Sequence, residues 1–214
     1  MTTNEAWQRR TTQRGQVDFT MMYVAHDAFN RDLARLARAA VNGSAASPAA
    51  RATWEVFTRQ LHTHHRAEDT SLWPQVRRAA TNVDEHAILD AMEVEHRQLD
   101  PLIERVDDSI RRGSHLVAEL TELTSTLAAH MRHEEDTALP LVERTIGAAG
   151  WDAFGQQVRR AQGGIRAAAA YLPWVLDDAP DAVQRTVLRM LPPPARLLYR
   201  KKWEPKYRRS GHLR

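Results

Sequence analysis

The chain has 214 residues, a formal net charge of +3 and 43% hydrophobic residues, which is enough for one folded domain with a sizeable core. It contains no cysteine, which excludes disulfide frameworks, thiolate zinc sites, iron–sulfur clusters and cysteine nucleophiles. No stretch reaches the roughly 18 apolar residues of a membrane span, and the N-terminus lacks the apolar run of a secretion signal. We therefore expect a cytoplasmic protein.

Helical periodicity runs through the chain, and no window alternates like a β-strand between hairpin turns. Residues 1–16 are expected to form an N-terminal extension. Four long helices are then predicted at about 17–41, 48–79, 83–112 and 115–146. Asn42-Gly43 is a helix stop, and Ser47-Pro48 is an N-cap followed by proline at the first helical position. Gly113 and Ser114 predict a similar break. Short connections favour antiparallel neighbours, so residues 17–146 predict an all-α, up-down four-helix bundle.

Residues 147–214 are expected to form helical straps and a basic tail. A fifth helix is predicted at about 150–169, weakened by Gly163-Gly164, with a short helix near 181–191 and three prolines after it. Tyr171 and Trp174, which lie between these two helices, are expected to cover one end of the bundle.

The basic charge belongs to the tail, because residues 196–214 carry +7 and the rest of the chain carries −4. Basic and aromatic residues alternate in it, as on some surfaces that bind anionic lipid or nucleic acid. We favour a strap that packs through Tyr199, Trp203 and Tyr207 while its cations stay solvated. We expect no nucleic-acid partner, whereas contact with a membrane surface or another protein, and the oligomeric state, stay open.

Each long helix carries an apolar seam at alternating steps of three and four residues. The seams are interrupted by six polar residues: His26, His64, Glu68, His96, His130 and Glu134. A histidine and a glutamate four residues apart share one helix face, so an imidazole nitrogen and a carboxylate oxygen can converge on one ion. Counted from the helix ends at about 1.5 Å per residue, the four histidines fall at similar depth in the bundle.

Spacing alone is not decisive, because six histidines have an acidic residue four positions later. His115 and Glu119, for example, fall off the seam and are expected to be a solvated pair. Internal repetition distinguishes two other pairs. The segment HHRAEDTSLWP from His64 matches HMRHEEDTALP from His130 at an offset of 66, and His26 and His96 repeat at an offset of 70.

Four histidines and two carboxylates in one buried layer predict a bound cation. An uncompensated ionised carboxylate in a core costs several kcal/mol, which a cation would offset. The alternative is a buried hydrogen-bond network between the histidines and the glutamates.

The pattern of a lone histidine and a His-x-x-x-Glu motif, present twice, resembles the hemerythrin-like family, also called the HHE cation-binding domain. The runs HHRAEDTSLWP and HMRHEEDTALPLVE carry this resemblance, which covers about residues 17–146, and the Ala/Arg-rich style resembles actinobacterial members. It implies a four-helix bundle that holds two iron ions bridged by carboxylates and an oxo or hydroxo group. Transferred onto this chain, it implies terminal ligands His26, His64, His96 and His130, with Glu68 and Glu134 as bridges.

The chain departs from the pattern of the oxygen-carrying members at two positions. Those members place two histidines four apart on the third helix, but here Met92 precedes His96 by one turn. They also use an aspartate five residues after the fourth-helix histidine, whereas Glu134 lies four after His130. The site is therefore expected to have an open metal position or an additional oxygen ligand.

Three further residues are candidates for the site. Tyr23, three residues before His26, could coordinate as a phenolate or donate a hydrogen bond, although a core tyrosine with a satisfied hydroxyl is the favoured interpretation. His65 and His133 flank the ligands and could support them or donate protons; surface or helix-interface roles are equally compatible with their positions. Histidine and carboxylate ligands suit iron, manganese and zinc alike, so iron rests on the resemblance.

Three functions are compatible with this sequence. The favoured hypothesis is a diiron enzyme that reacts with hydrogen peroxide or dioxygen, with a catalase-like or oxidative-stress role. The second is reversible binding of dioxygen or nitric oxide for sensing or storage, without turnover. The third makes the tail the functional part and the bundle an adaptor or an iron store.

Overall fold

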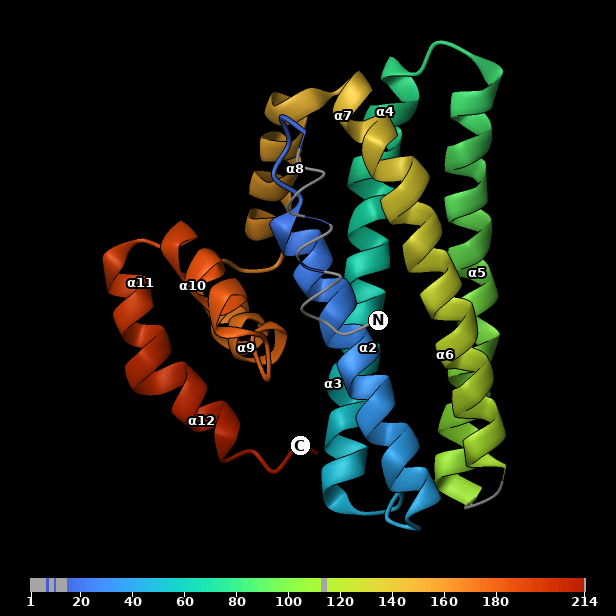
Figure 1. Ribbon diagram of the computed structural model, residues 1–214, viewed down its shortest axis with the longest axis vertical. Coiled ribbons are helices and arrows are strands. Elements are labelled where there is room, and N and C mark those ends of the chain that lie inside the picture. Colours follow the sequence, from blue (N-terminus) through green and yellow to red (C-terminus); the bar gives the residue numbers. More distant parts are fainter. Residues whose placement is uncertain (1–6, 8–9, 11–14, 113–114, 214) are drawn as a thin grey trace.

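The computed structural model describes Trp7, Arg10 and residues 15–112 and 115–213, and every regular element within these residues is a helix. Four rods form an antiparallel bundle (Figure 1). They are α2 (Thr20–Val41); α3 (Pro48–Ala67) continued by η1 (Glu68–Leu72) and α4 (Trp73–Ala79); α5 (Val83–Arg112); and α6 (Leu116–His133) continued by η2 (Glu134–Ala138) and α7 (Leu139–Thr145). Contacts link α2 to α3, α3 to α5, α5 to α6 and α6 to α2, which closes the ring. The predicted all-α four-helix bundle is confirmed.

The first interhelical break forms as predicted. The Ser47 hydroxyl accepts a hydrogen bond from the Ala50 backbone N–H at 3.2 Å, and Pro48 occupies the first turn of α3. Gly43 has a φ of 71°, which glycine adopts without strain. The break predicted at Gly113 and Ser114 lies outside the described residues.

Two wide π-helical turns interrupt the rods, and each ends two residues before a proline. In η1 the Trp73 N–H bonds to the Glu68 carbonyl five residues earlier, and in η2 the Leu139 N–H bonds to that of Glu134. A proline has no N–H to donate and its ring clashes with the carbonyl four residues back, so a wider turn before Pro74 and Pro140 relieves that conflict. The repeated proline of the sequence thus places a widened turn at each glutamate of the His-x-x-x-Glu motifs.

The polar layer predicted from the seams divides the apolar core into two clusters. One cluster contains Phe29, Leu61, Leu99 and Leu127, and the other contains Met22, Leu72, Met92 and Leu141. On every rod the histidine, or the histidine and glutamate pair, of the polar layer lies between a residue of one cluster and a residue of the other. The layer is therefore enclosed on both sides by apolar side chains.

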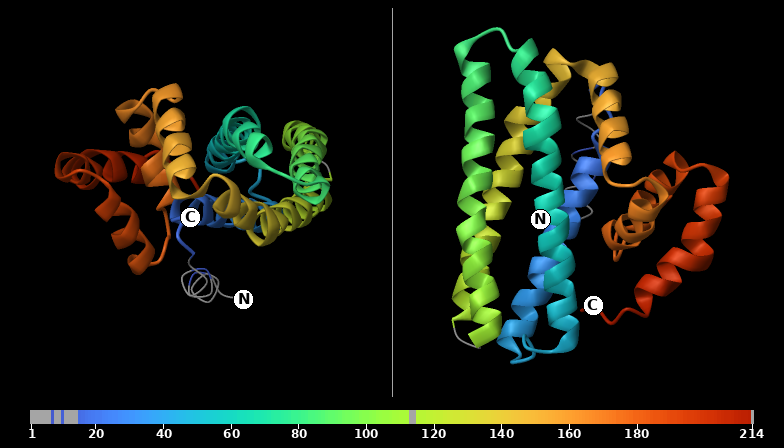
Figure 2. Two further views of the ribbon diagram at one scale, coloured as in Figure 1. Left: turned by 90° about the horizontal axis from the view of Figure 1, so that it is seen from above. Right: turned by 180° about the vertical axis from the view of Figure 1, so that it is seen from behind.

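Residues 147–213 form a helical layer on one side of the bundle, beside α2 (Figures 1 and 2). Its elements are α8 (Gly147–Ala161), α9 (Ile165–Val175), α10 (Asp181–Met190), α11 (Pro193–Leu198), η3 (Tyr199–Trp203) and α12 (Glu204–Arg208). The single helix predicted at about 150–169 is wrong, because Gly163 and Gly164 adopt φ values of 89° and 61° and separate α8 from α9. Tyr171 and Trp174 consequently lie in a helix that packs against the side of α2 and not over an end of the bundle.

The basic tail is helical and packs through its aromatic residues. Tyr199 is 3% exposed, and Trp203 and Tyr207 are partly buried against the same core, while Arg200 and Lys201 are exposed. This is the arrangement that the strap interpretation predicts. Among the described residues, none of the helices combines the length and the apolar character that crossing a bilayer requires.

Candidate metal centre

The six predicted residues converge in the polar layer from all four rods. Their side chains are nearly inaccessible: His26 and Glu68 are 1% exposed and Glu134 is 0% exposed. His96 and His130 are also buried, and His64 is the most exposed of the six. The chain therefore places four imidazoles and two carboxylates together in a region from which water is largely excluded.

One group of metal-ligating atoms comes from His26, His64 and Glu134, and these atoms lie within 4.8 Å of one another. The two Nε2 atoms of His26 and His64 are 3.4 Å apart, and His26 Nε2 lies 3.1 Å from Glu134 Oε2. The three side chains come from α2, α3 and η2. They form a compact set of two nitrogens and one oxygen around a common point.

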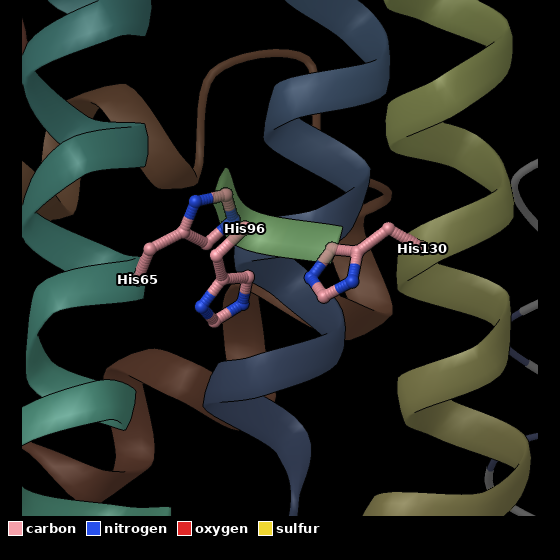
Figure 3. Close-up of side chains that lie close together, drawn as sticks. All are labelled: His65, His96 and His130. Atoms are coloured by element: carbon pink, nitrogen blue, oxygen red, sulfur yellow. The ribbon is translucent and has the colours of Figure 1, made fainter. Parts of the chain in front are cut away.

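A second group comes from His65, His96 and His130, whose ligating nitrogens also lie within 4.8 Å of one another. Figure 3 shows the rings of His65 and His96 lying over one another, with His130 facing them from α6. The rings of His65 and His96 are stacked at 4.0 Å with an interplanar angle of 12°, and that of His130 meets His96 edge-on at 4.7 Å. Three imidazoles thus face one point.

Glu68 lies between the two groups. Its Oε1 is 3.1 Å from His64 Nε2 in the first group, and its Oε2 is 3.6 Å from His96 Nε2 in the second. One carboxylate therefore reaches both groups with its two oxygens. This is the geometry that a carboxylate bridge between two adjacent cations requires.

Three of the imidazoles are held from behind by carboxylates. His26 Nδ1 is 2.8 Å from Glu135, His96 Nδ1 is 2.8 Å from Asp69, and His130 Nδ1 is 2.9 Å from Glu95. A carboxylate acceptor at Nδ1 favours the tautomer whose proton is on Nδ1, which leaves the Nε2 lone pair directed inward. This arrangement is typical of metal-binding histidines in proteins.

Seven inward atoms have no hydrogen-bond partner among the described residues. They are Nε2 of His65, His96 and His130 and both carboxylate oxygens of Glu68 and of Glu134. Although some of these oxygens lie 3.1 Å from an imidazole nitrogen, the atoms are not oriented for a hydrogen bond. Buried polar atoms without partners are costly, and bound cations would satisfy them. The donor set of nitrogens and oxygens therefore fits a metal ion better than a hydrogen-bond network.

The pKa values of several side chains in the polar layer are shifted far from their ordinary values. Burial, followed by the charge of Glu134, raises the pKa of Glu68 well above its ordinary value. Burial opposes the protonation of His26, but Glu134 and Glu135 outweigh it and raise its pKa to about 9. Burial and the neighbouring His26 lower the pKa of His64 to about 3, and burial beside His96 lowers that of His65. His64 and His65 are thus neutral at pH 7, which is the form that binds metals.

A family model for the hemerythrin HHE cation-binding domain matches residues 17–142, more than half of the chain. The chain belongs to the hemerythrin HHE cation-binding family. No curated protein and no solved structure matches it significantly. The family resemblance seen in the two repeated motifs is confirmed, and the protein is a cation-binding hemerythrin-domain protein.

Sequence reasoning missed the three carboxylates behind the histidines, although the repeat contains a signal for two of them. In each motif of this hemerythrin domain the glutamate is followed directly by a second acidic residue, which gives the pairs Glu68-Asp69 and Glu134-Glu135. In each pair the first acid enters the polar layer, and the second crosses to the lone histidine of the other helical hairpin. The second acidic residue of each motif was visible in the sequence. Which histidine it contacts depends on which helices are neighbours in the fold.

The remaining predicted residues lie around the hemerythrin site. Tyr23 packs under the Arg10 guanidinium, 4.9 Å from its ring centroid, and lines a pocket with Glu135. Burial and the charge of Glu135 raise the pKa of Tyr23, which keeps it a phenol at neutral pH. His133 shares Glu95 with His130, since its Nδ1 is 2.7 Å from that carboxylate. A ligand role for Tyr23 stays a prediction.

The surface interpretation of His115 and Glu119 agrees with their positions. His115 is exposed and Glu119 pairs with Arg105 at 2.8 Å, away from the polar layer.

α9 also brings Tyr171 near the site. Burial raises the pKa of Tyr171, and the negative charge of Glu68 raises it further.

Asp69→Ala is expected to weaken metal binding about 10- to 100-fold, because His96 would lose the carboxylate that orients it. The measurement is a competition titration of the purified protein against a chelator. Asp100→Ala, an exposed change on the same helix as His96, is the control and should retain the wild-type affinity. An unchanged affinity in Asp69→Ala would show that this carboxylate does not support the ligand.

Proposed function

We propose that this protein holds a non-haem diiron centre that reacts with hydrogen peroxide or dioxygen. The observation that carries the proposal is Glu68, whose two oxygens face two separate groups of metal-ligating nitrogens. A single ion would leave one of these groups without a cation. Two adjacent ions would use both groups and both glutamates.

The proposed ligands are the four predicted histidines, His26, His64, His96 and His130, with Glu68 and Glu134 between the two positions. A bound pair of irons would supply two-electron redox chemistry toward peroxide or dioxygen. The choice of iron follows from the oxygen and nitrogen donors together with the family resemblance, since the donors alone also suit manganese and zinc.

A pocket of about 310 Å³ lies beside the His26 side of the site and would hold a small polar molecule there. It is lined by Arg10, Tyr23 and Glu135, and Glu135 in turn holds His26 Nδ1. Arg10 is fixed by ion pairs to Asp27 at 2.8 Å and to Glu135 at 2.6 Å. In this pocket the Tyr23 phenol and the Arg10 guanidinium would donate hydrogen bonds to peroxide oxygen atoms.

The test is oxygen evolution from hydrogen peroxide by the iron-loaded protein. We expect a rate above that of free iron at the same concentration, and we expect Glu68→Ala to reduce it to the free-iron level. The iron content of each sample is measured in parallel. A rate that equals the free-iron control for the fully loaded wild type would rule out the peroxide reaction.

Reversible binding of dioxygen or nitric oxide is the second candidate function. It is favoured by the apolar side chains that enclose the polar layer, among them Met92 at 0% and Met22 at 4% exposure. Such a lining excludes water and would protect a bound gas from protons. A spectral change of the diferrous protein that reverses when the gas is removed supports this function, and irreversible oxidation counts against it.

A further inference from the structure

His65 breaks the internal symmetry of the site. At the offset of 66 that relates the two His-x-x-x-Glu motifs, the counterpart of His65 is Met131. Met131 is 4% exposed and belongs to the apolar core, whereas His65 is 8% exposed and lies in the polar layer. The first hairpin therefore adds an imidazole at a position where the second hairpin has only an apolar side chain.

The surroundings of His65 do not explain it as a packing residue. Its Nε2 has no hydrogen-bond partner among the described residues, and the same holds for Nε2 of His96 and of His130. One ring nitrogen of His65 lies within 4.8 Å of ring nitrogens of both histidines. An apolar residue such as the methionine of the second hairpin would fill the same space without an unpaired buried nitrogen. The ring faces the point that the other two imidazoles share (Figure 3).

We infer that His65 is the third imidazole ligand of one metal position, and that it replaces the imidazole that Met92 does not provide. This inference rests on the proposed diiron centre. One position would then have His65, His96 and His130, and the other would have His26 and His64, with Glu68 and Glu134 shared. The two positions differ by one imidazole.

This difference indicates which position meets the small molecule. The position with two imidazoles contains His26, which is held by Glu135 at the wall of the Tyr23 pocket. The position with three imidazoles is enclosed between α3, α5 and α6. His65 would fill the coordination sphere of the enclosed ion, so the position with two imidazoles would keep the free coordination site.

The experiment compares iron content and Mössbauer spectra of the wild type, His65→Ala and His65→Leu. We expect two quadrupole doublets of equal area in the wild type. In both variants, one doublet is expected to shift or disappear, and one iron per chain should bind at least tenfold more weakly. Added imidazole should restore the original doublet in His65→Ala, where the side chain leaves space, but not in His65→Leu. His62→Ala, one turn earlier on α3 and 51% exposed in its side chain, is the matched control.

The outcomes separate this inference from the proposed function. If the wild type binds two irons and both His65 variants keep two irons with unchanged doublets, His65 is not a ligand, while the diiron proposal stands. If the wild type itself does not bind two irons, the proposed function is wrong. Circular dichroism verifies folding; should His65→Ala unfold, His65→Leu, which resembles the methionine of the other hairpin, still provides the comparison.

Discussion

Glu68→Gln is expected to stabilise the metal-free protein at pH 7 and to abolish the stabilisation that metal gives the wild type. Glu68 is 1% exposed, and burial together with Glu134 raises its pKa well above that of a free glutamate. A carboxyl group whose pKa is raised by folding contributes its full stability below its unfolded pKa, and that contribution is lost as the pH rises through the folded value. At pH 7, above the unfolded pKa, part of that contribution is lost in the wild type, whereas glutamine does not titrate. The free energy of unfolding of the metal-free variant should therefore exceed that of the wild type at pH 7.

With metal added, the wild type is expected to become more stable than Glu68→Gln, which is the reverse of the order without metal. Metal that binds only the folded state stabilises it by ~4 kcal/mol when the free metal is at about 1,000 times its dissociation constant. The wild type should therefore melt at a higher temperature with ferrous iron than without it, and Glu68→Gln should not respond. Melting is measured at pH 5 and pH 7, with iron and with a chelator. The advantage of the variant without metal should shrink toward pH 5.

The control for this pair of measurements is Glu104→Gln, an exposed change that removes one negative charge from α5. It should melt like the wild type and keep the response to iron. A metal-free Glu68→Gln that is less stable than the wild type at pH 7 would show that the buried carboxyl is compensated without a cation.

The long helices and the six predicted site residues could be predicted from the sequence because they depend on local periodicity. Residues at steps of three and four share a face in any helix, so the seams determine which side chains point inward. The caps at Ser47 and Gly43 depend only on local conformation. Repetition then distinguished His64 and His130 from surface histidines with the same spacing.

His65 could not be assigned in this way. It follows His64 directly, about 100° around the helix, where an ordinary seam predicts a flank of the bundle. Whether such a residue enters the core depends on the rotation of α3 against α5 and α6 and on the space that Met92 and Met131 leave. These are tertiary properties. The same holds for Glu95 and Asp69, which support histidines on neighbouring helices.

The C-terminal layer was predicted less well for a different reason. Gly163 and Gly164 can be tolerated in a helix or can end it, and their effect depends on whether the following segment finds a surface to pack against. Here Trp174 finds one on α2. Its ring lies 5.2 Å from that of Phe29, and Phe29 lies 5.4 Å from His64, so the layer supports the metal site from behind.

Asp32→Ala is expected to destabilise the protein by about 3–5 kcal/mol, because it removes the buried charge that joins α2 to α9. Asp32 is 2% exposed, accepts a hydrogen bond from the Trp174 indole N–H at 2.7 Å and pairs with Arg31 at 2.8 Å. Arg35, 3% exposed, lies 3.8 Å from Asp32 and pairs with Asp177 at 2.7 Å. Alanine would leave the indole and Arg31 without this acceptor in a buried place. The loss is measured by urea unfolding followed by tryptophan fluorescence.

Asp32→Asn separates charge from shape, since its amide oxygen can still accept the Trp174 hydrogen bond. We expect it to lose less stability than alanine, and Asp181→Ala, an exposed change in α10, to lose almost none. The effect should extend to the metal, because a detached α9 would leave Phe29 and His64 uncovered. Iron should then pass to a chelator faster in Asp32→Ala than in the wild type under folding conditions. Equal stability of Asp32→Ala and the wild type, or equal rates of iron loss, would show that the C-terminal layer does not secure the site.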